Sequence, residues 1–338
     1  MPVKLIVQIP CLNEAETIAE TIRGIPRSIA GVDAVEVLVI DDGSRDGTSD
    51  VALAAGADHI VRHRGNMGLG WAFRSGLDAC LARGADIIVN TDADNQYAAS
   101  SIPDLIGPIL DGRADIVVGD RRPSTLPHFS WAKRRLQKLG TFAVASLSGL
   151  DVGDAVSGFR ALSREAAIRT VILSPFSYTI EMLIQAGRKR MSVVSVPVST
   201  NKVERRSRLI RSVPNFIARS VTLMTRAFAM YHPVRIFAFV GLLLFLVGTV
   251  PIVRFLIFAA MGQSGGHVQS LILGGVLVVL GFLAMMFGLL ADLIGFNRQL
   301  LELVIERTRT LDYGRRPGGE PERTSGGEPP NSGRRPQR

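Results

Sequence analysis

Residues 87–96 read Ile87-Ile88-Val89-Asn90-Thr91-Asp92-Ala93-Asp94-Asn95-Gln96, and they carry the strongest structural signal in the chain. The first three are an apolar run typical of a buried strand, and two carboxylates follow, one residue apart. If the strand continues, both side chains point to the same face. Such a pair suits a hard divalent cation, which is often shared with substrate phosphates. One Asp-x-Asp also arises by chance in a chain of this length, so its neighbours decide its meaning.

The first half of the chain alternates between segments typical of strands and segments typical of helices. We expect strands at residues 5–9, 36–40, 59–62, 86–90 and 115–118, and residues 154–160 and 193–198 complete the globular part. We expect helices at residues 14–23, 47–55, 70–82 and 102–110, and a basic helix beginning near Trp131. This alternation predicts an α/β fold with a parallel sheet wrapped by helices. In such folds, ligands bind beyond the carboxyl ends of the strands.

Polar clusters follow three of the expected strands, at residues 10–14, 41–44 and 92–96. Parallel strands end at one edge of a sheet, so we expect the three clusters to meet there. Three clusters at one edge arise by chance far less often than one, which makes Asp92 and Asp94 candidate metal ligands. Asp41 and Asp42 could accept hydrogen bonds from a ribose or a base, or cap the helix that begins near Gly47.

Two apolar segments, residues 237–253 and 268–291, lie in the second half of the chain. Each has about the length needed to cross a hydrocarbon core of roughly 30 Å. The first extends to residue 260 if Arg254 snorkels to the outer interface. The link at 261–270 has no Lys or Arg, whereas both flanks are rich in arginine, so the positive-inside rule places both flanks in the cytoplasm. The alternative is two buried core helices.

The remaining segments have distinct compositions. Residues 211–232 alternate apolar and arginine positions at helical spacing, which predicts an amphipathic helix in the membrane interface or, alternatively, one packed on the globular part. The last residues, 312–338, are rich in Gly, Pro, Arg and Glu and are expected to be disordered. Residues 1–210 would form the globular domain, and residues 233–311 the two-helix membrane region. Cys11 and Cys80 are the two cysteines, expected as thiols in a reducing cytosol.

Five motifs, taken in order, resemble those of family 2 glycosyltransferases with the GT-A fold, which implies a Rossmann-like, mostly parallel sheet flanked by helices. They are Pro10-x-x-Asn13-Glu14, Asp41-Asp42-Gly43-Ser44-x-Asp46-Gly47-Thr48, Asn66-x-Gly68-x-Gly70, Asp92-Ala93-Asp94-x-Gln96 and Ser157-Gly158-Phe159-Arg160. More narrowly, residues 3 to about 210 resemble the polyprenyl-phosphate glycosyltransferases, which include dolichol-phosphate mannose synthases and GtrB-type glucosyltransferases. The two terminal spans fit the GtrB-like branch. A homo-tetramer would also fit that branch, and no nucleic-acid partner is expected.

The resemblance implies an inverting, metal-dependent transfer of one sugar from UDP-glucose or GDP-mannose to a polyprenyl phosphate at the cytoplasmic face of the cell membrane. The implied donor-binding residues are Pro10, Asn13, Glu14, Asp41, Asp42 and Gly68. The implied ligands of Mg²⁺ or Mn²⁺, set against the donor diphosphate, are Asp92, Asp94 and Gln96. Asp94, Arg121 and Arg134 are the implied catalytic residues, with Arg121 facing phosphates and Arg134 facing the acceptor phosphate.

The acceptor side is matched less closely. Lys138 stands where the family often has a hydroxyl residue, four positions after Arg134. Arg205, Arg206 and Arg208 match a mobile acceptor loop, and a solvated surface or contact with anionic lipid is the alternative for each. A phosphate monoester has a second pKa near about 6, so the acceptor oxygen is already anionic and requires no strong general base. Direct attack by that oxygen at C1 of the sugar would invert the anomeric centre.

The histidines agree with that chemistry, because all five lie outside the three polar clusters. They are His59, His63, His128, His232 and His267. Asp154 is expected to orient a polar group or to cap a buried helix. One alternative function is a processive polysaccharide synthase, but Lys189 stands where the Gln-x-x-Arg-Trp motif of those enzymes requires Trp. The other is a non-catalytic membrane protein that retains the fold, against which the intact set of Asp92, Asp94 and Gln96 argues.

Overall fold

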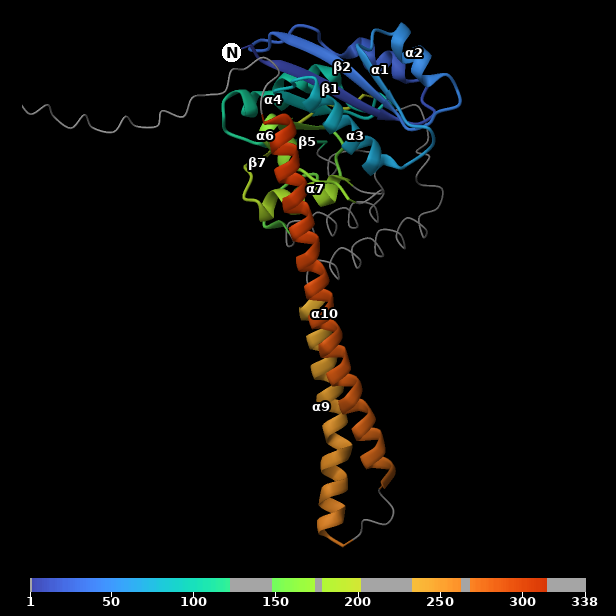
Figure 1. Ribbon diagram of the computed structural model, residues 1–338, viewed down its shortest axis with the longest axis vertical. Helices are drawn as coiled ribbons and strands as arrows, with labels where there is room; N and C mark the ends of the chain where they lie inside the picture. The colour runs from blue at the N-terminus through green and yellow to red at the C-terminus, as the bar shows by residue number, and fades with distance from the viewer. Residues whose placement is uncertain (1, 122–147, 174–177, 202–232, 263–267, 315–338) are drawn as a thin grey trace, which may run out of the picture.

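A seven-stranded sheet organises the globular part of the protein (Figure 1). The computed structural model describes residues 2–121, 148–173, 178–201, 233–262 and 268–314. The strands are β1 (Lys4–Cys11), β2 (Ala34–Asp41), β3 (His59–Arg62), β4 (Ile87–Asn90), β5 (Ile116–Asp120), β6 (Arg160–Ser163) and β7 (Val193–Pro197). Their order across the sheet is β3-β2-β1-β4-β6-β5-β7.

Most strands of the sheet run in parallel, and one is antiparallel to its neighbours. β1, β2, β3 and β4 pair in parallel, and β5 pairs in parallel with β7. β6 lies between β4 and β5 and is antiparallel to both. The expected GT-A fold with a mostly parallel sheet is therefore confirmed, and β6 is the exception because the chain enters it from the edge at which β4 and β5 end. The result is the mixed sheet typical of a GT-A-like fold.

Helices cover both faces of the sheet and give it two apolar cores. They are α1 (Ile18–Gly24), α2 (Thr48–Ala54), α3 (Leu69–Ala82), η1 (Ala99–Ser101), α4 (Ile102–Leu110), α6 (Arg164–Arg169) and α7 (Tyr178–Arg188). Side chains alternate along a strand, so Ile6 of β1 packs with α3, α6 and α7, whereas Leu5 and Val7 pack with α1, α2 and α4. The globular part is thus a three-layer sandwich.

Helix α1 begins later than the apolar pattern predicts. The expected helix starts at Glu14, but α1 starts at Ile18. Asn13 has a φ of 55°, in the left-handed region that asparagine tolerates better than most residues. The carbonyl of Glu14 accepts hydrogen bonds from the backbone N–H groups of Thr17 and Ile18, at 3.1 and 3.0 Å. These bonds form a turn, which leaves residues 12–14 as a loop at the end of β1.

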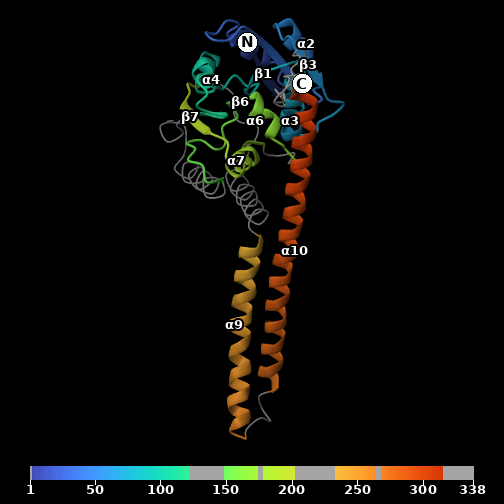
Figure 2. The same ribbon diagram turned by 60° about the vertical axis from the view of Figure 1, so that its left-hand side comes forward.

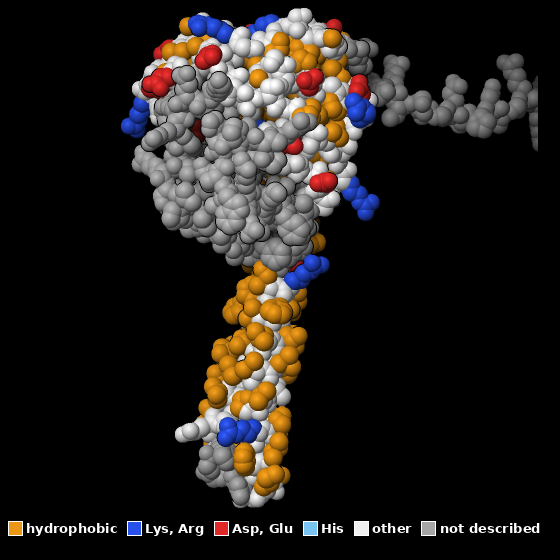
Figure 3. Space-filling view, turned by 180° about the vertical axis from the view of Figure 1, so that it is seen from behind, with side chains coloured by type: hydrophobic (Ala, Val, Ile, Leu, Met, Phe, Trp, Pro, Cys, Tyr) orange, Lys and Arg blue, Asp and Glu red, His pale blue; other side chains and the backbone are white. Residues whose placement is uncertain are grey.

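Two long helices, α9 (Pro233–Ala260) and α10 (Val268–Tyr313), project from the globular part side by side (Figures 1 and 2). Both are long and apolar enough to cross a membrane, and few of their side chains are buried. Figure 3 shows that hydrophobic side chains cover most of the surface of this stalk. The two helices approach each other closely at glycines. A Cβ at Gly241 would lie only 2.6 Å from the carbonyl oxygen of Gly281, which is too close for a larger residue. The expected apolar segments are confirmed as helices.

Helix α10 is longer than its apolar segment. It has 46 residues and continues unbroken past residue 291 to Tyr313. Beyond the stalk it lies along the globular part, next to α6 (Figures 1 and 2), and makes ion pairs with Asp78 of α3 and Glu181 of α7. The sequence pattern predicted the second span but not this docked extension.

Candidate functional site

The three polar clusters meet at one edge of the sheet, as expected. Cys11 at the end of β1 is the Cα partner of Asp41 at the end of β2, and β4 pairs with β1 in the same direction. The loops at residues 12–14, 42–44 and 91–96 therefore leave the sheet side by side. Pro10 lies inside β1 and is buried, so it shapes the start of this edge from within the sheet.

Asp41 is fully buried, and its carboxylate is used within the protein. It accepts hydrogen bonds from the backbone N–H of Ser44, at 2.7 Å, and from the Ser49 hydroxyl. The Arg62 guanidinium lies 3.6 Å away. Burial alone would raise the pKa of Asp41, but these hydrogen bonds and the charge of Arg62 hold it below its usual value. Asp41 thus stays ionised and closes the turn that follows β2.

Asp42 clamps a second loop. Its Oδ1 accepts from the backbone N–H of Met67 at 2.9 Å, and its Oδ2 accepts from that of Gly68 at 2.8 Å. His63 Nδ1 lies 2.7 Å from the same Oδ1, and His63 Nε2 lies 3.0 Å from the Ser75 hydroxyl. Gly68 is the N-cap of α3, so this carboxylate fixes the point where that helix begins.

His63 lies outside the three polar clusters in the sequence, but the fold brings its side chain to Asp42. His63 follows β3, and β3 pairs with β2 so that Arg62 is the partner of Asp41. The residue after one strand then lies beside the residue after its neighbour. The β2–β3 register would have revealed this contact, but the separate motifs do not contain it. Asp41 and Asp42 were expected to bind the nucleotide, and their direct contact with it stays a prediction.

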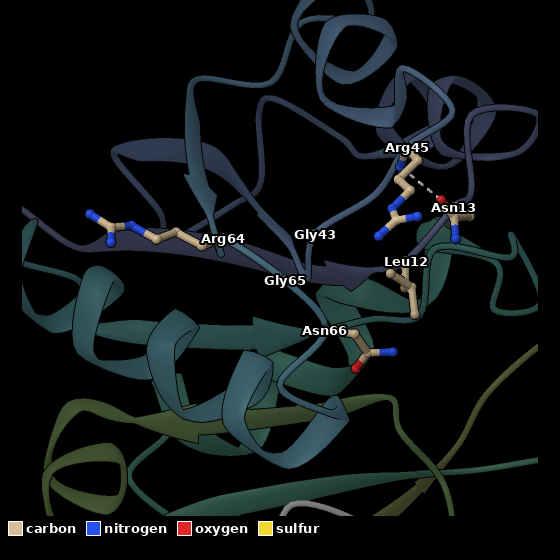
Figure 4. Close-up of a pocket in the computed structure, with 7 residues that line it drawn as sticks. All are labelled: Leu12, Asn13, Gly43, Arg45, Arg64, Gly65 and Asn66. Carbon is tan, nitrogen blue, oxygen red and sulfur yellow. Dashed lines mark hydrogen bonds between the residues drawn. The ribbon is translucent and has the colours of Figure 1, made fainter.

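A pocket of about 340 Å³ opens beside these loops (Figure 4). That volume is at the lower end of the range for small-molecule sites, about 300–1,000 Å³. The pocket is lined by Leu12, Asn13, Gly43, Arg45, Arg64, Gly65 and Asn66. In Figure 4 the side chains of Arg45, Asn13, Leu12 and Asn66 lie around one space, whereas that of Arg64 extends away from it. The pocket therefore presents amide and guanidinium groups.

Hydrogen bonds between neighbouring loops hold the pocket wall. The backbone N–H of Asn13 donates to the Ser44 hydroxyl at 2.9 Å, and Asn13 Oδ1 accepts from the backbone N–H of Arg45 at 2.9 Å. The backbone N–H of Glu14 donates to the Thr48 hydroxyl at 3.0 Å. Asn13 and Glu14 thus fix the loop after β1 against the loop after β2.

Gly43 forms the tightest point of the pocket wall. Its φ is +85°, and a Cβ there would lie 2.7 Å from both Cα and the carbonyl carbon of Gly65. The loops after β2 and β3 therefore approach closely enough that position 43 requires glycine for conformation and for space. Gly47 has a similar φ of +83°, yet a Cβ there would meet nothing within 4 Å.

The carboxylate pair lies in a turn rather than on a strand. β4 ends at Asn90, and the turn through Asn95, whose φ is 55°, carries Asp92 and Asp94. The alternation argument for their orientation is therefore wrong, although both lie at the expected edge. Asp94 is exposed and its Oδ1 accepts from the backbone N–H of Gln96 at 3.1 Å. A Cβ on Gly158 would lie 2.8 Å from each Asp92 oxygen, so glycine makes room for that carboxylate.

The electrostatics of the pair fit a divalent cation. Burial and the negative charge of Asp94 raise the pKa of Asp92 to about 6, while Arg121 and Arg160 oppose the shift. A cation between the carboxylates would remove the repulsion that causes part of this shift. Within the described residues, His, Cys, Asp and Glu form no group of three or more that could hold a metal. Two carboxylates completed by phosphate oxygens and water are typical of Mg²⁺ sites.

Arg121 follows β5 and is held in place by a buried acid. Its Nε and Nη2 donate to the two oxygens of Asp154, at 2.7 and 3.2 Å, and Asp154 is fully buried. The guanidinium also lies 5.8 Å from the centre of the Tyr97 ring. Burial works to lower the pKa of Arg121, but Tyr97, Asp154 and Asp92 raise it above its usual value. Of the two roles open to Asp154, orienting a polar group is the one observed.

Beneath Asp92 lies a layer of buried polar groups that sequence reasoning did not single out. Asn90 Nδ2 donates to the Gly158 carbonyl at 2.8 Å and to the Tyr178 hydroxyl at 3.0 Å. Arg160, although part of a recognised motif, is fully buried and donates to the carbonyls of Ser157, Thr179 and Ala155. These bonds fix the loop that carries Asp154 and Gly158.

Several expected residues lie outside the part of the chain that the structure describes. They are Arg134, Lys138, Arg205, Arg206 and Arg208, together with the helix near Trp131, the amphipathic segment at 211–232 and the tail from residue 315. The acceptor-side assignments therefore stay predictions.

Known proteins have sequences similar to that of this chain. A relative called polyprenol monophosphomannose synthase, from Mycolicibacterium smegmatis, is 29% identical over 60% of this chain and 78% of its own length. An uncharacterized glycosyltransferase of Mycobacterium bovis is 34% identical over 57% of this chain and 83% of its own length.

A solved structure is similar in fold. Glucosyl-3-phosphoglycerate synthase from Mycobacterium tuberculosis, in complex with Mn²⁺, UDP and glucosyl-3-phosphoglycerate, has a TM-score of 0.50 and 27% identity. The match covers 67% of this chain and 79% of that one. The model of glycosyl transferase family 2 matches residues 6–170, from β1 to the segment after α6, and so includes every polar cluster at this edge. The chain therefore belongs to glycosyl transferase family 2.

Proposed function

We propose that this glycosyltransferase transfers one sugar from a nucleotide sugar to a polyprenyl phosphate and releases a lipid-linked monosaccharide. The observation that carries the proposal is the Asp92–Asp94 pair at the same sheet edge as the 340 Å³ pocket. That edge belongs to a domain with two apolar helices at its C-terminal end. A nucleotide site on a domain that carries two membrane-length helices favours a donor from water and an acceptor from the bilayer. The name of the mycolicibacterial relative supports this substrate class.

The donor nucleotide would occupy the pocket between the loops after β1 and β2. Asn13, Arg45 and Asn66 offer hydrogen-bond donors and acceptors there, and Glu14 lies on the same loop as Asn13. Asp42 holds the backbone of Gly68 at this edge, so the loop before α3 would lie close to the donor. UDP-glucose and GDP-mannose are the two donors proposed.

The donor diphosphate would extend from the pocket toward Asp92 and Asp94. These carboxylates and Gln96 would hold Mg²⁺ or Mn²⁺. The ion would neutralise charge that develops on the leaving diphosphate. Arg121 would add a second positive charge on the same group, kept in position by its bidentate pair with Asp154. The presence of Mn²⁺ in the similar solved structure supports a divalent ion here.

The acceptor supplies its own nucleophile. A phosphate oxygen of the polyprenyl phosphate forms a bond to C1 of the sugar while the bond from C1 to the nucleoside diphosphate breaks. The nucleoside diphosphate leaves with the electron pair, and the anomeric centre inverts. The acceptor oxygen carries no proton that must be removed, so no catalytic base is required. We propose Arg134, Arg205, Arg206 and Arg208 as the positive groups that meet this phosphate.

The two helices of the stalk would hold the enzyme in the cell membrane with the globular domain and the C-terminus in the cytoplasm. α9 and the first half of α10 would cross the bilayer. The arginine-rich flanks of both helices support this orientation.

Transfer can be tested directly with membranes that contain the full-length protein. They are incubated with a panel of nucleotide sugars, polyprenyl phosphate and Mg²⁺ or Mn²⁺, and the lipid product is measured by mass spectrometry. We expect one added hexose per lipid with one of the donors, and none with Asp94→Ala membranes. Products with several sugars would favour a processive synthase, and the absence of any lipid-linked sugar with every donor would contradict the proposal.

A further inference from the structure

The part of α10 beyond the stalk docks on the globular domain through ion pairs. Arg298 Nη2 pairs with the buried Glu181 of α7. Two turns later, Glu306 pairs with Lys189 at 2.7 Å and with Arg169 at 3.4 Å. The helix ends at Tyr313, whose carbonyl accepts from Arg164 at 2.5 Å. The contacts extend over residues 298–313, which we call the docked segment.

Arg309 is the buried centre of the docked segment. It is 5% exposed, and its Nη2 lies 2.7 Å from an Asp78 oxygen on α3. Its Nη1 donates to the carbonyl of Ala167 at 3.4 Å and to that of Thr170. A buried cation is stable only when it is paired and hydrogen-bonded, so these contacts fix the side chain and the helix that carries it. Arg307, two residues earlier, is exposed.

The docked segment packs on α6 and also makes ion pairs with α3 and α7, the two helices that support the site. Gly68, which Asp42 clamps, is the N-cap of α3. The ring of Phe73 in α3 stacks on that of Tyr178 in α7, with the ring centroids 4.0 Å apart. The Tyr178 hydroxyl bonds to Asn90, directly below Asp92. The docked segment therefore contacts α3 and α7. The N-terminal ends of these two helices support the loops at residues 42–44 and 91–96, at the edge of the sheet that we call the catalytic edge.

The other end of α10 is fixed in the stalk. A Cβ on Gly288 would lie 2.9 Å from Cβ of Phe237 in α9, so the two helices are in close contact there. From Gly288 to Arg298 the chain is one uninterrupted helix, about 15 Å long at about 1.5 Å per residue. All 46 residues measure about 70 Å, whereas a hydrocarbon core needs about 30 Å. The remainder is a short rigid link followed by the docked segment.

We propose that residues 292–313 of α10 act as a strut that holds the catalytic edge at a set distance and angle from the bilayer, with Arg309 as its main positioning residue. The inference rests on the proposed function, because a set position matters only when one substrate is confined to the membrane. A strut affects transfer to an embedded acceptor and leaves donor binding unchanged. A mere anchor needs no rigid connection.

The decisive variant inserts Gly-Ser-Gly-Ser between Ile294 and Gly295, where a Cβ on Gly295 meets nothing within 4 Å. The insertion leaves the stalk contact at Gly288 and every contact of the docked segment intact, and it removes only the rigid link. The control inserts the same four residues after Gly314, beyond the end of α10. Both full-length proteins are placed in vesicles with Mg²⁺.

Two acceptors separate positioning from general damage. With long-chain polyprenyl phosphate in the bilayer, we expect the link insertion to lower kcat/KM for the acceptor about tenfold or more, because small displacements of reacting groups are costly. With a short isoprenyl phosphate dissolved in water, we expect wild-type rates, and the donor KM should not change. Unchanged rates with both acceptors, or equal losses with both, would overturn the strut.

Point variants test Arg309 itself. We expect Arg309→Ala to show the same selective loss to a smaller degree and Arg309→Lys, which keeps the charge toward Asp78, to recover part of it. Arg307→Ala on the exposed face should match the wild type. Equal effects at positions 307 and 309 would contradict the positioning role of Arg309.

A measurement that does not depend on catalysis tests the strut separately from the proposed function. Cys11 and Cys80 are buried, and burial raises the pKa of both thiols, so a new surface cysteine can be labelled selectively. Energy transfer from a dye on Asp50→Cys to fluorescent lipid reports the height of the domain above the bilayer. We expect a narrow distribution in the wild type and the control, and a broad one after the link insertion. Identical distributions would refute the strut even if transfer to lipid phosphate is observed.

Discussion

The loops at residues 12–14, 42–44 and 91–96 form the edge of the sheet at which we propose that the donor binds, here called the donor edge. The donor edge and the docked segment of α10 are both held by polar contacts, but they are assembled in different ways. At the donor edge, backbone N–H groups of one loop donate to side chains of the next, as Asn13 does to Ser44 and Gly68 to Asp42, across about 30 residues of chain. The docked segment relies on ion pairs between side chains, such as Lys189 with Glu306, more than 100 residues apart. The donor edge can therefore form within the globular domain, whereas the docked segment is in place only after both stalk helices.

The largest effect should come from the donor edge. Asp94→Ala removes one of the two carboxylates proposed to hold the metal, and we expect the transfer rate to fall about a thousandfold, comparable with loss of a key electrostatic group. Asp94 is exposed, so folding and membrane insertion should not change. Asp104→Ala, an exposed carboxylate on α4, serves as the control. A wild-type transfer rate in Asp94→Ala would remove Asp94 from the site.

Arg121→Ala should follow, with kcat lower by about a hundredfold. The loss has two causes, because the leaving diphosphate loses a positive charge and the buried Asp154 loses its ion pair with Arg121. The second cause should also lower the free energy of unfolding of the globular domain, by about 3 kcal/mol. Steady-state kinetics and thermal unfolding measure the two effects. Arg113→Ala, at the other end of β5 and exposed, should change neither.

A matched pair of glycines tests how tightly the donor edge is built. We expect Gly43→Ala to weaken donor binding about tenfold, since the new methyl group must push the loops after β2 and β3 apart. Gly47→Ala imposes the same backbone strain without a clash, and its cost should be confined to about 1 kcal/mol of stability. Titration calorimetry with the nucleoside diphosphate gives the affinities. Equal affinities for the two variants would mean that the close approach at Gly43 does not shape the pocket.

The smallest effect should come from the stalk. A Cβ on Gly274 would lie 2.5 Å from Cγ1 of Ile252 and 2.7 Å from the carbonyl oxygen of Gly248, whereas one on Gly275 would meet nothing within 4 Å. We expect Gly274→Ala to reduce transfer to a bilayer acceptor by about threefold through a looser hairpin. Gly275→Ala should have no effect, and donor affinity should be unchanged in both. A change in donor affinity with Gly274→Ala would show that the two regions are coupled.

The sequence predicted which loops meet at the donor edge, because each strand and the polar residues after it form one short stretch of the chain. β1, β2 and β4 are apolar runs, and the polar residues after them belong to the same local stretch. Even there, the strand was expected to continue through Asp92 and Asp94 and so to orient their side chains, but β4 ends at Asn90 and a turn follows. His63 was missed because only the pairing of β2 with β3 brings it to Asp42.

Contacts between distant segments could not be predicted in this way. Arg121 and Asp154 are 33 residues apart, and the antiparallel direction of β6 is known only from its pairing with β4 and β5. Arg298, Glu306 and Arg309 recur at helical spacing, which indicates one functional face on α10. Their partners on α3, α6 and α7 become known only once those helices are placed on the sheet.

The uninterrupted helix between Gly288 and Arg298 also sets a rule for how this protein can change during evolution. Each residue of an α-helix turns it by about 100°. Insertion of one helical residue in the link would swing the whole globular domain about a quarter of a turn around the axis of α10, relative to α9. Steps of about seven residues nearly restore the original phase. Homologues that keep both contacts should therefore vary the length of this link in near-whole turns, and their domains should stand at discrete heights.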